Sequence, residues 1–156
     1  MKKNIVLAAI GGFVVAIVMV IALMPSMMIV EHESKYATVD ETTEALAKSI
    51  KANGWSVAGK IRNMNKTIQK HGFNFEREVR IIELCKAKYA KDMIETNPEI
   101  STMMPCAWGV YEKDGKIIIS SMNMGLMGKI FGGNIAKIVG EYVANDEHKI
   151  LSAVIR

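Results

Sequence analysis

The N-terminal part of the chain holds its longest uninterrupted apolar run. From Ile5 to Met24 no residue is charged or strongly polar. These twenty residues, as a helix rising about 1.5 Å per residue, span about 30 Å, which is the thickness of the hydrocarbon core of a bilayer. A cleaved signal peptide has a shorter apolar region of about 7–15 residues and a small-residue cleavage site, which this segment lacks. The pattern therefore predicts an uncleaved transmembrane helix at residues 5–24, within an anchor of residues 1–26.

The charges on either side of this run predict its orientation. Lys2 and Lys3 precede it, whereas Glu31, His32 and Glu33 are the first ionisable residues that follow. The positive-inside rule keeps the lysines in the cytoplasm. The sequence therefore predicts a single-pass membrane protein whose domain lies on the outer face of the membrane, which is the periplasmic face in a Gram-negative cell.

Beyond the anchor, residues 27–156 show strand and helix periodicities in turn. Apolar residues with a period of two predict strands, and apolar residues at helical spacing predict helices. A capping box, Thr38 with Glu41, marks the start of the first helix. Strands are expected at residues 28–34, 55–61, 75–84, 106–112 and 116–122, and helices at 39–53, 63–70, 86–95 and after 133. This order, β-α-β-(α)-β-α-β-β-α, predicts a single α+β domain with helices packed on a small mixed sheet.

Two segments carry further local predictions. In the third strand, Phe75, Val79 and Ile81 are expected on one face, opposite an exposed face of Glu76, Glu78 and Arg80. Residues 125–133 are rich in glycine and are interpreted as a turn and close-packing segment. The helix that follows should carry an apolar stripe formed by Ile135, Ile138, Val139, Tyr142 and Val143.

The pair Asp114-Gly115 predicts a hairpin between the fourth and fifth strands, because a type I′ turn needs positive φ at both central residues. In this register Lys113 pairs with Lys116 and Val110 with Ile119. The same register brings Cys106 opposite Asn123, at the end of the sheet far from the turn. A thiol and several thioethers are therefore expected to gather there, since Met103, Met104, Met122 and Met124 are neighbours in the sequence or across the strands.

The balance of charged residues in the domain bears on whether its partner is a nucleic acid. Removing Lys2 and Lys3 from the 20 Lys and Arg of the chain leaves 18, against 16 Asp and Glu. Such a near balance, without a basic cluster interleaved with aromatics, argues against a nucleic-acid binder. The histidines show no paired metal-ligand spacing, and the stretch from Asp146 through Glu147 and His148 to Lys149 is interpreted as a solvated face.

Several motifs along the domain together resemble those of a known protein family. They are Val39 to Gly54, Glu83-Leu84-Cys85, Tyr89-Ala90, Pro98, Met104-Pro105-Cys106, Val110-Tyr111-Glu112, Gly115 and Met127 to Gly133. With them, essentially all of the chain after Met27 resembles the family catalogued as domain of unknown function 302. The resemblance implies a compact α+β fold, often seen as a dimer in this family, and no established activity. Family members often have Arg after the Pro-Cys pair, whereas this chain has Ala107, so a role tied to that basic residue is absent. The usual Asn-Pro after the first cysteine is Lys86-Ala87 here.

Three interpretations of the two cysteines are open. Both can be buried structural residues, with methionines filling gaps in the core. Cys85 and Cys106 can form a disulfide, since the outer compartment is oxidising. Cys106 can also bind a soft metal or haem together with Cys85 or with Met122 and Met124, because thiolate and thioether select Cu(I) and both residue types serve as axial haem ligands. No CxxC or CxxCH motif is present to favour the third.

Enzyme signatures are missing from the sequence. It has no Gly-x-Ser-x-Gly motif, no phosphate-binding glycine loop in a strand–helix context and no clear pair of carboxylates for acid–base work. We therefore expect a non-enzymatic binding or interaction domain at the outer face of the membrane, whose partner is a membrane protein, a small ligand or its own second copy. The alternative is a thiol-dependent, copper- or haem-dependent redox or metal-handling protein centred on Cys106.

Overall fold

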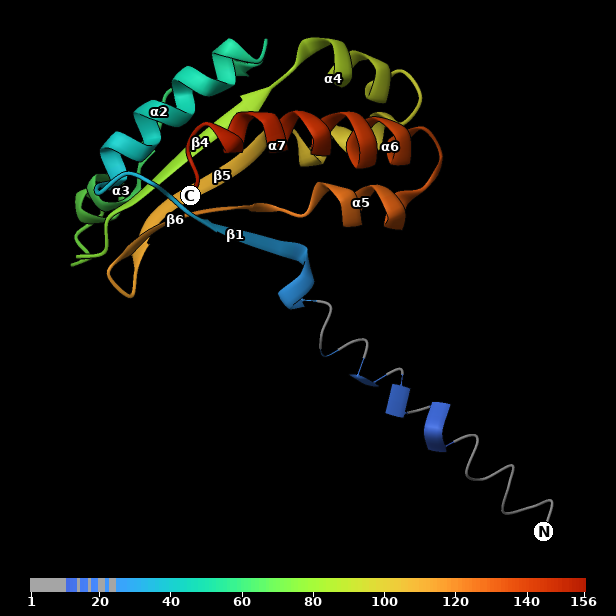
Figure 1. Cartoon of the computed structure of the whole chain (residues 1–156), viewed down its shortest axis with the longest axis horizontal. Helices are drawn as coiled ribbons and strands as arrows, with labels where there is room; N and C mark the ends of the chain where they lie inside the picture. Colours follow the sequence, from blue (N-terminus) through green and yellow to red (C-terminus); the bar gives the residue numbers. More distant parts are fainter. Residues whose placement is uncertain (1–10, 14, 17, 20–21, 23–24) are drawn as a thin grey trace, which may run out of the picture.

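The computed structural model describes residues 11–13, 15–16, 18–19, 22 and 25–156 (Figure 1). Most of the predicted transmembrane helix at residues 5–24 lies outside these described residues. Among the residues that are described, no helix is both long enough and apolar enough to cross a membrane. Residues 29–156 form an α+β fold, as the sequence predicted.

One antiparallel sheet forms the centre of the domain. Its strands are β1 (Ile29–Glu33), β2 (Ser56–Val57), β3 (Arg62–Asn63), β4 (Val79–Cys85), β5 (Cys106–Lys113) and β6 (Lys116–Met122). Their spatial order is β1-β6-β5-β4-β2, and β3 also pairs with β4. Every strand pair in the described part of the chain is antiparallel, so the expectation of a mixed sheet is wrong. The chain leaves β4 and re-enters β5 at the same end of the sheet, without the crossover that a parallel pair requires.

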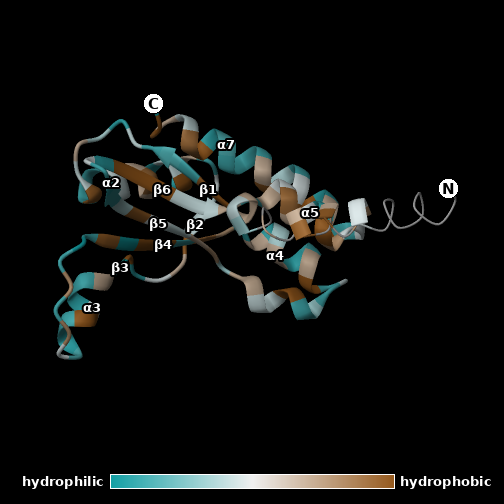
Figure 2. Cartoon of the chain, turned by 90° about the horizontal axis from the view of Figure 1, so that it is seen from below, coloured by the Kyte–Doolittle hydropathy of each residue, from teal (hydrophilic) through white to brown (hydrophobic). Residues whose placement is uncertain are grey.

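Helices cover one face of this sheet and one of its ends. They are α2 (Val39–Ala52), α3 (Met64–Lys70), α4 (Ala87–Ile94), the 3-10 helix η1 (Pro98–Met103), α5 (Met124–Phe131), α6 (Gly133–Lys137), the π-helix η2 (Ile138–Val143) and α7 (Ala144–Ser152). The predicted capping box is confirmed, because Thr38 Oγ1 accepts from the Glu41 amide and Glu41 accepts from the Thr38 amide. α2 and α7 lie side by side, and Ser49 Oγ donates to the carbonyl oxygen of Ile150 across their contact at 2.8 Å. Figure 2 shows hydrophilic colour over much of the outer surface of α7, whereas α5 is largely hydrophobic.

The second and third predicted strands differ from the structure. In place of one strand at residues 55–61, the chain forms two short strands, β2 and β3, with a left-handed residue, Gly59 (φ 72°), in the connection between them. β4 begins at Val79, and its core-facing residues are Arg80, Ile82 and Leu84 rather than the predicted apolar face. Arg80 is buried, and its Nε donates to Asp40 Oδ1 at 2.9 Å, in the first turn of α2. Adjacent apolar residues in this strand made both registers plausible by sequence alone.

The glycine-rich segment is helical, not a turn. Asn123 caps α5, since its Oδ1 accepts from the Leu126 amide at 3.0 Å. Gly132 and Gly133 then end the helix with positive φ. The close-packing prediction is confirmed within α5, because a Cβ atom on Gly128 would lie 2.5 Å from the Cα atom of Gly140 in η2. The predicted apolar stripe after residue 133 is buried except for one member, Tyr142, which is 40% exposed.

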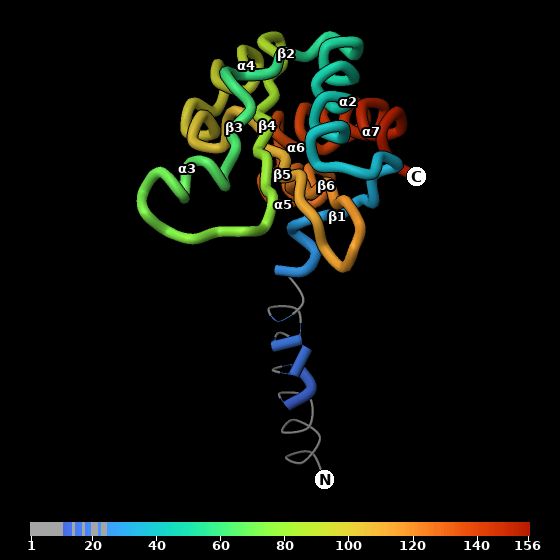
Figure 3. Tube along the Cα trace, turned by 90° about the vertical axis from the view of Figure 1, so that its left-hand side faces the viewer, coloured from blue at the N-terminus to red at the C-terminus, as the bar shows by residue number. Residues whose placement is uncertain are grey.

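The predicted hairpin register is confirmed. Lys113 pairs with Lys116 and Val110 with Ile119. On its other edge, β5 pairs with β4, and Cys106 lies opposite Leu84. On the far side, β1 pairs with β6 so that Ile29 lies opposite Met122. Figure 3 shows that the described part of residues 11–22 extends away from the domain beyond β1.

Candidate functional site

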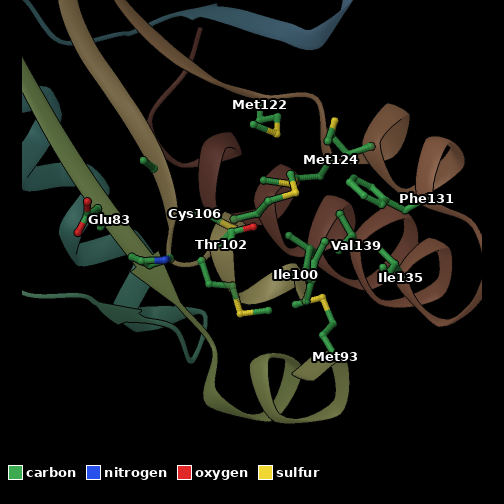
Figure 4. Close-up of a pocket in the computed structure, with 16 residues that line it drawn as sticks. Glu83, Met93, Ile100, Thr102, Cys106, Met122, Met124, Phe131, Ile135 and Val139 are labelled. Atoms are coloured by element: carbon green, nitrogen blue, oxygen red, sulfur yellow. The ribbon is translucent and has the colours of Figure 1, made fainter. Parts of the chain in front are cut away.

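An apolar cavity of about 390 Å³ lies at the end of the sheet where β5 begins and β6 ends (Figure 4). Its wall is rich in sulfur: the sulfur-bearing lining residues are Met93, Met103, Met104, Cys106, Met122, Met124 and Met127. Branched and aromatic side chains complete the apolar part, among them Ile100, Phe131, Ile135, Val139 and Val143. We call this cavity the methionine pocket. The predicted gathering of a thiol and thioethers at this end of the sheet is confirmed.

Different elements supply the walls of the methionine pocket. Cys106 comes from the first residue of β5, and Met122 from the last residue of β6. The neighbouring wall is α5, which places Met124 and Met127 on its buried side. η1 contributes a further wall, as about two turns of 3-10 helix that begin at Pro98 and end shortly before β5. The lining residues come from β4, α4, η1, β5, β6, α5, α6 and η2, and only the β5–β6 part of the pocket is encoded locally by the hairpin.

The Cys106 thiol is neutral in this environment. Burial, together with the charge of Glu147 and the proximity of Cys85, raises the pKa of Cys106 to about 12. A thiol with such a pKa is almost entirely protonated at neutral pH, whereas nucleophilic and metal-binding cysteines react as thiolates. Cys106 therefore contributes a small, soft, uncharged surface to the pocket.

The four residues predicted as soft-metal ligands are brought together only in part. Cys106, Met122 and Met124 line the methionine pocket, but Cys85 does not. Cys85 and Cys106 both border a second, much smaller cavity of about 20 Å³, and both are free thiols. In the described part of the chain, no group of three or more His, Cys, Asp or Glu residues could hold a metal ion. Of the described residues that line the methionine pocket, none is a histidine.

Glu147, whose charge contributes to the raised pKa of the pocket residue Cys106, differs from its sequence-based prediction. It was assigned to a solvated face, but its side chain is buried, with 7% exposed, while the neighbouring His148 and Lys149 are exposed. Trp108 Nε1 donates to Glu147 Oε1 at 3.1 Å. Burial raises the pKa of Glu147 to about 7, and the hydrogen bond from Trp108 opposes this shift. Helical spacing is the sequence signal for this burial, because Glu147 lies four residues after Val143 and three before Ile150, on the buried stripe of α7.

Asp146 points to a different cluster, between α7 and the start of α4. Its Oδ2 accepts from Lys86 Nζ at 2.7 Å, from Trp55 Nε1 at 3.1 Å and from Tyr89 Oη at 3.1 Å. Although burial acts to raise the pKa of Asp146, the hydrogen bonds from Lys86 and Trp55 hold it below its usual value. The Lys86 ammonium also lies 4.7 Å from the ring centre of Tyr89. Because these polar groups satisfy one another, the cluster joins α4 to α7 and is not an open binding site.

Comparisons with known proteins agree on the fold. The sequence profile of the family described as "Domain of unknown function DUF302" matches residues 30–155. A crystal structure of an uncharacterised conserved DUF302 protein from Bacillus stearothermophilus is similar, with a TM-score of 0.72 and 20% sequence identity over 81% of this chain and 98% of that one. No curated protein matches the sequence. At this level of identity the similarity establishes the fold, and the chemistry of the site must be argued from its own residues.

Proposed function

The chain belongs to the DUF302 family, and since that name assigns no activity, we propose a function from the methionine pocket: the protein is a membrane-anchored domain that binds a small apolar ligand there. The observation that carries the proposal is the pocket itself. Ligand sites are concave, mostly apolar and roughly 300–1,000 Å³ in volume. The methionine pocket has a volume of about 390 Å³ and a lining dominated by thioethers and hydrocarbon.

Methionine suits a site of this kind. Its unbranched side chain is flexible and polarizable, so that it adapts to ligands of varied shape. A core that only needed to be filled would close around such side chains, because protein interiors pack as densely as organic crystals. The neutral Cys106 thiol adds no charge that an apolar ligand would have to compensate. The lining therefore favours an uncharged, apolar molecule over a charged one.

The anchor is the second part of the proposal. The apolar run of residues 5–24 is long enough to span a bilayer, and its described residues Phe13, Val15, Val18 and Met19 are all more than half exposed. Apolar side chains presented in this way on a helix suit a lipid environment. With Lys2 and Lys3 in the cytoplasm, the domain lies on the outer, periplasmic face.

The sulfur lining favours a second candidate function, the handling of Cu(I). Cys106, Met122 and Met124 border one cavity, and thiol and thioether ligands select Cu(I). Binding would have to displace the proton from a thiol whose pKa is about 12, which weakens this candidate relative to an apolar ligand.

Photolabelling of the full chain in lipid nanodiscs tests the lead proposal. The probe is 3-trifluoromethyl-3-phenyldiazirine, a small uncharged molecule that forms a reactive carbene under light. We expect adducts on the peptide that carries Met122, Met124 and Met127. Thr102→Trp should reduce them several-fold, because Thr102 lines the pocket and is exposed, so that an indole there obstructs the space.

Thr67→Trp is the matched control. Like Thr102, Thr67 is exposed and donates a 3.0 Å hydrogen bond to a nearby backbone carbonyl, but it lies on α3, away from the pocket. Equal pocket labelling in both variants would contradict the proposal. Copper that co-purifies with the full chain and is lost in Cys106→Ser would support the second candidate in its place.

A further inference from the structure

The proposed membrane anchor places a source of apolar ligands, the lipid bilayer, close to the methionine pocket. We infer that the pocket takes an acyl chain of a phospholipid from the membrane that holds the N-terminal segment, an inference that rests on the proposed function. Three features of the described residues lead to it: the link between the pocket and the point where the anchor ends, the surface of α5 and α6, and the position of Phe131.

The wall of the pocket is joined directly to the residues that follow the apolar run. Asn123 stands between two lining residues, Met122 and Met124. Its side-chain Nδ2 donates to the carbonyl oxygen of Met27 at 3.1 Å, and its backbone amide donates to the carbonyl oxygen of Met28 at 2.8 Å. The same side chain caps α5 through its Oδ1. The start of α5 is therefore fixed beside the segment that leaves the membrane, only a few residues after the run ends.

The surface formed by α5 and α6 has the composition of a membrane-contacting surface. Ile130 and Phe131 are 50% and 47% exposed. Two exposed cations, Lys129 and Lys137, lie on the same pair of helices. Across the whole stretch from Gly115 to Gly140 the sequence has no Asp or Glu. Apolar side chains flanked by lysines, with no carboxylate, suit a bilayer interface with phosphate headgroups.

Phe131 connects this surface to the pocket. It is one of the residues that line the methionine pocket (Figure 4). Because its surface is almost half exposed, the pocket reaches the exterior at this side chain. An acyl chain that entered here would leave its headgroup near the lysines of α5 and α6. On the neighbouring edge, Met122 is paired with Ile29, which is itself 51% exposed. Apolar side chains therefore lead from the residues after the anchor, through Ile29 and Met122, to the lining of the pocket.

A photoreactive phospholipid tests the inference. The full chain is placed in nanodiscs that contain phosphatidylglycerol with a diazirine in its acyl chain, and adducts are mapped by mass spectrometry after illumination. We expect adducts of phospholipid mass on the Met122–Met127 peptide, reduced several-fold by Thr102→Trp and unchanged by Thr67→Trp. Adducts within residues 5–24 in every variant would show that the lipid is reactive and that the run contacts it.

A charged substitution on the surface of α5 distinguishes the entry of a phospholipid chain from the membrane from the binding of a small ligand in the pocket. Ile130→Glu should lower phospholipid labelling of the pocket several-fold, because the carboxylate opposes contact with the bilayer, while labelling by the small uncharged diazirine stays unchanged. Ile61→Glu, at an exposed isoleucine of the connection between β2 and β3, is the matched control and should leave both signals unchanged.

The outcomes distinguish the inference from the proposal beneath it. Labelling of the pocket by the small probe, with phospholipid adducts confined to residues 5–24, would overturn the lipid inference and leave the binding function intact. Absence of pocket labelling by both probes would overturn both. Pocket labelling by a photoreactive fatty acid of the same chain length, but not by the phospholipid, would assign the ligand to free fatty acids and contradict a membrane phospholipid source.

Discussion

Two apolar regions of the same domain are built in different ways. Between α2, α7 and the middle of the sheet, the side chains of Leu46, Ile50, Ile82, Trp108 and Ile119 are fully buried. At the end of the sheet, methionines and Cys106 surround a cavity of about 390 Å³. The first region is closed by branched and aromatic residues with fixed shapes, whereas flexible thioethers form a large part of the lining of the second, beside branched and aromatic residues. The comparison supports the proposal that the first region stabilises the fold and that the second binds a ligand.

The largest effect is expected in the closed region. Ile82→Ala removes a fully buried side chain between the sheet and its helices, so it should lower the free energy of unfolding by about 2–5 kcal/mol through lost transfer energy and a new cavity. Urea denaturation of the full chain in mild detergent measures this loss in the free energy of unfolding. A loss under about 1 kcal/mol would show that this region is not densely packed, and the comparison would fail.

Glu147 lies at the border of the two regions and should make stability depend on pH. Because burial raises its pKa in the folded state from 4.5 to about 7, its stabilising contribution is complete below about pH 4.5 and is lost as the pH rises through about 7. At pH 8 the Glu147→Gln variant should therefore be more stable than the parent chain by up to about 3 kcal/mol, since the amide need not be charged.

The difference between Glu147→Gln and the parent should disappear at pH 4. Glu141→Gln, an exposed glutamate in η2, is the control and should leave the pH dependence unchanged. Unfolding curves from pH 4 to 8 give the comparison. A pH profile of Glu147→Gln parallel to that of the parent would mean that Glu147 is not buried as described.

The contact between α5 and η2 positions one wall of the pocket. Substitutions at two glycines of α5 test this contact. Gly128→Ala would place a Cβ atom 2.5 Å from the backbone of Gly140, so the helices must separate, at a cost of about 1–3 kcal/mol. Gly125→Ala meets only Asn123 Oδ1 at 3.6 Å and should stabilise the helix slightly, by up to about 1 kcal/mol. Thermal unfolding of both variants provides the measurement; equal effects would contradict the close approach of α5 to η2.

The sequence predicted some parts of this arrangement and not others, for physical reasons. The capping box of α2 and the Asp114-Gly115 hairpin are local signals, and both are confirmed. The hairpin register also brought Cys106 to the same end as Met122 and Met124. The strand that begins at Val79 was misassigned because both of its faces are apolar, so the periodicity does not distinguish its core side.

Non-local contacts account for the other differences. Arg80 is buried because Asp40, forty residues earlier, accepts its hydrogen bond, and no pattern within β4 indicates this partner. The methionine pocket needs η1, α4 and α6 as well as the hairpin, and their approach to one another cannot be derived from spacing along the chain. Gly128 was interpreted within a turn because glycine disfavours helices, whereas here its missing side chain lets two helices touch.

The smallest effect on stability is expected in the methionine pocket, and it decides whether the comparison of the two regions holds. Met122 is only half-buried, and it borders space that is already empty, so Met122→Ala removes few contacts and creates little new cavity. It should cost about 1 kcal/mol or less, against about 2–5 kcal/mol for Ile82→Ala, because the cost of a truncation follows the contacts and the cavity that it leaves. The same urea titration, carried out on both variants side by side, measures the difference. If Met122→Ala cost as much as Ile82→Ala, the methionines would be holding the fold together, and the pocket would be core rather than a site. A small loss in stability together with changed photolabelling of the pocket would assign these side chains to binding.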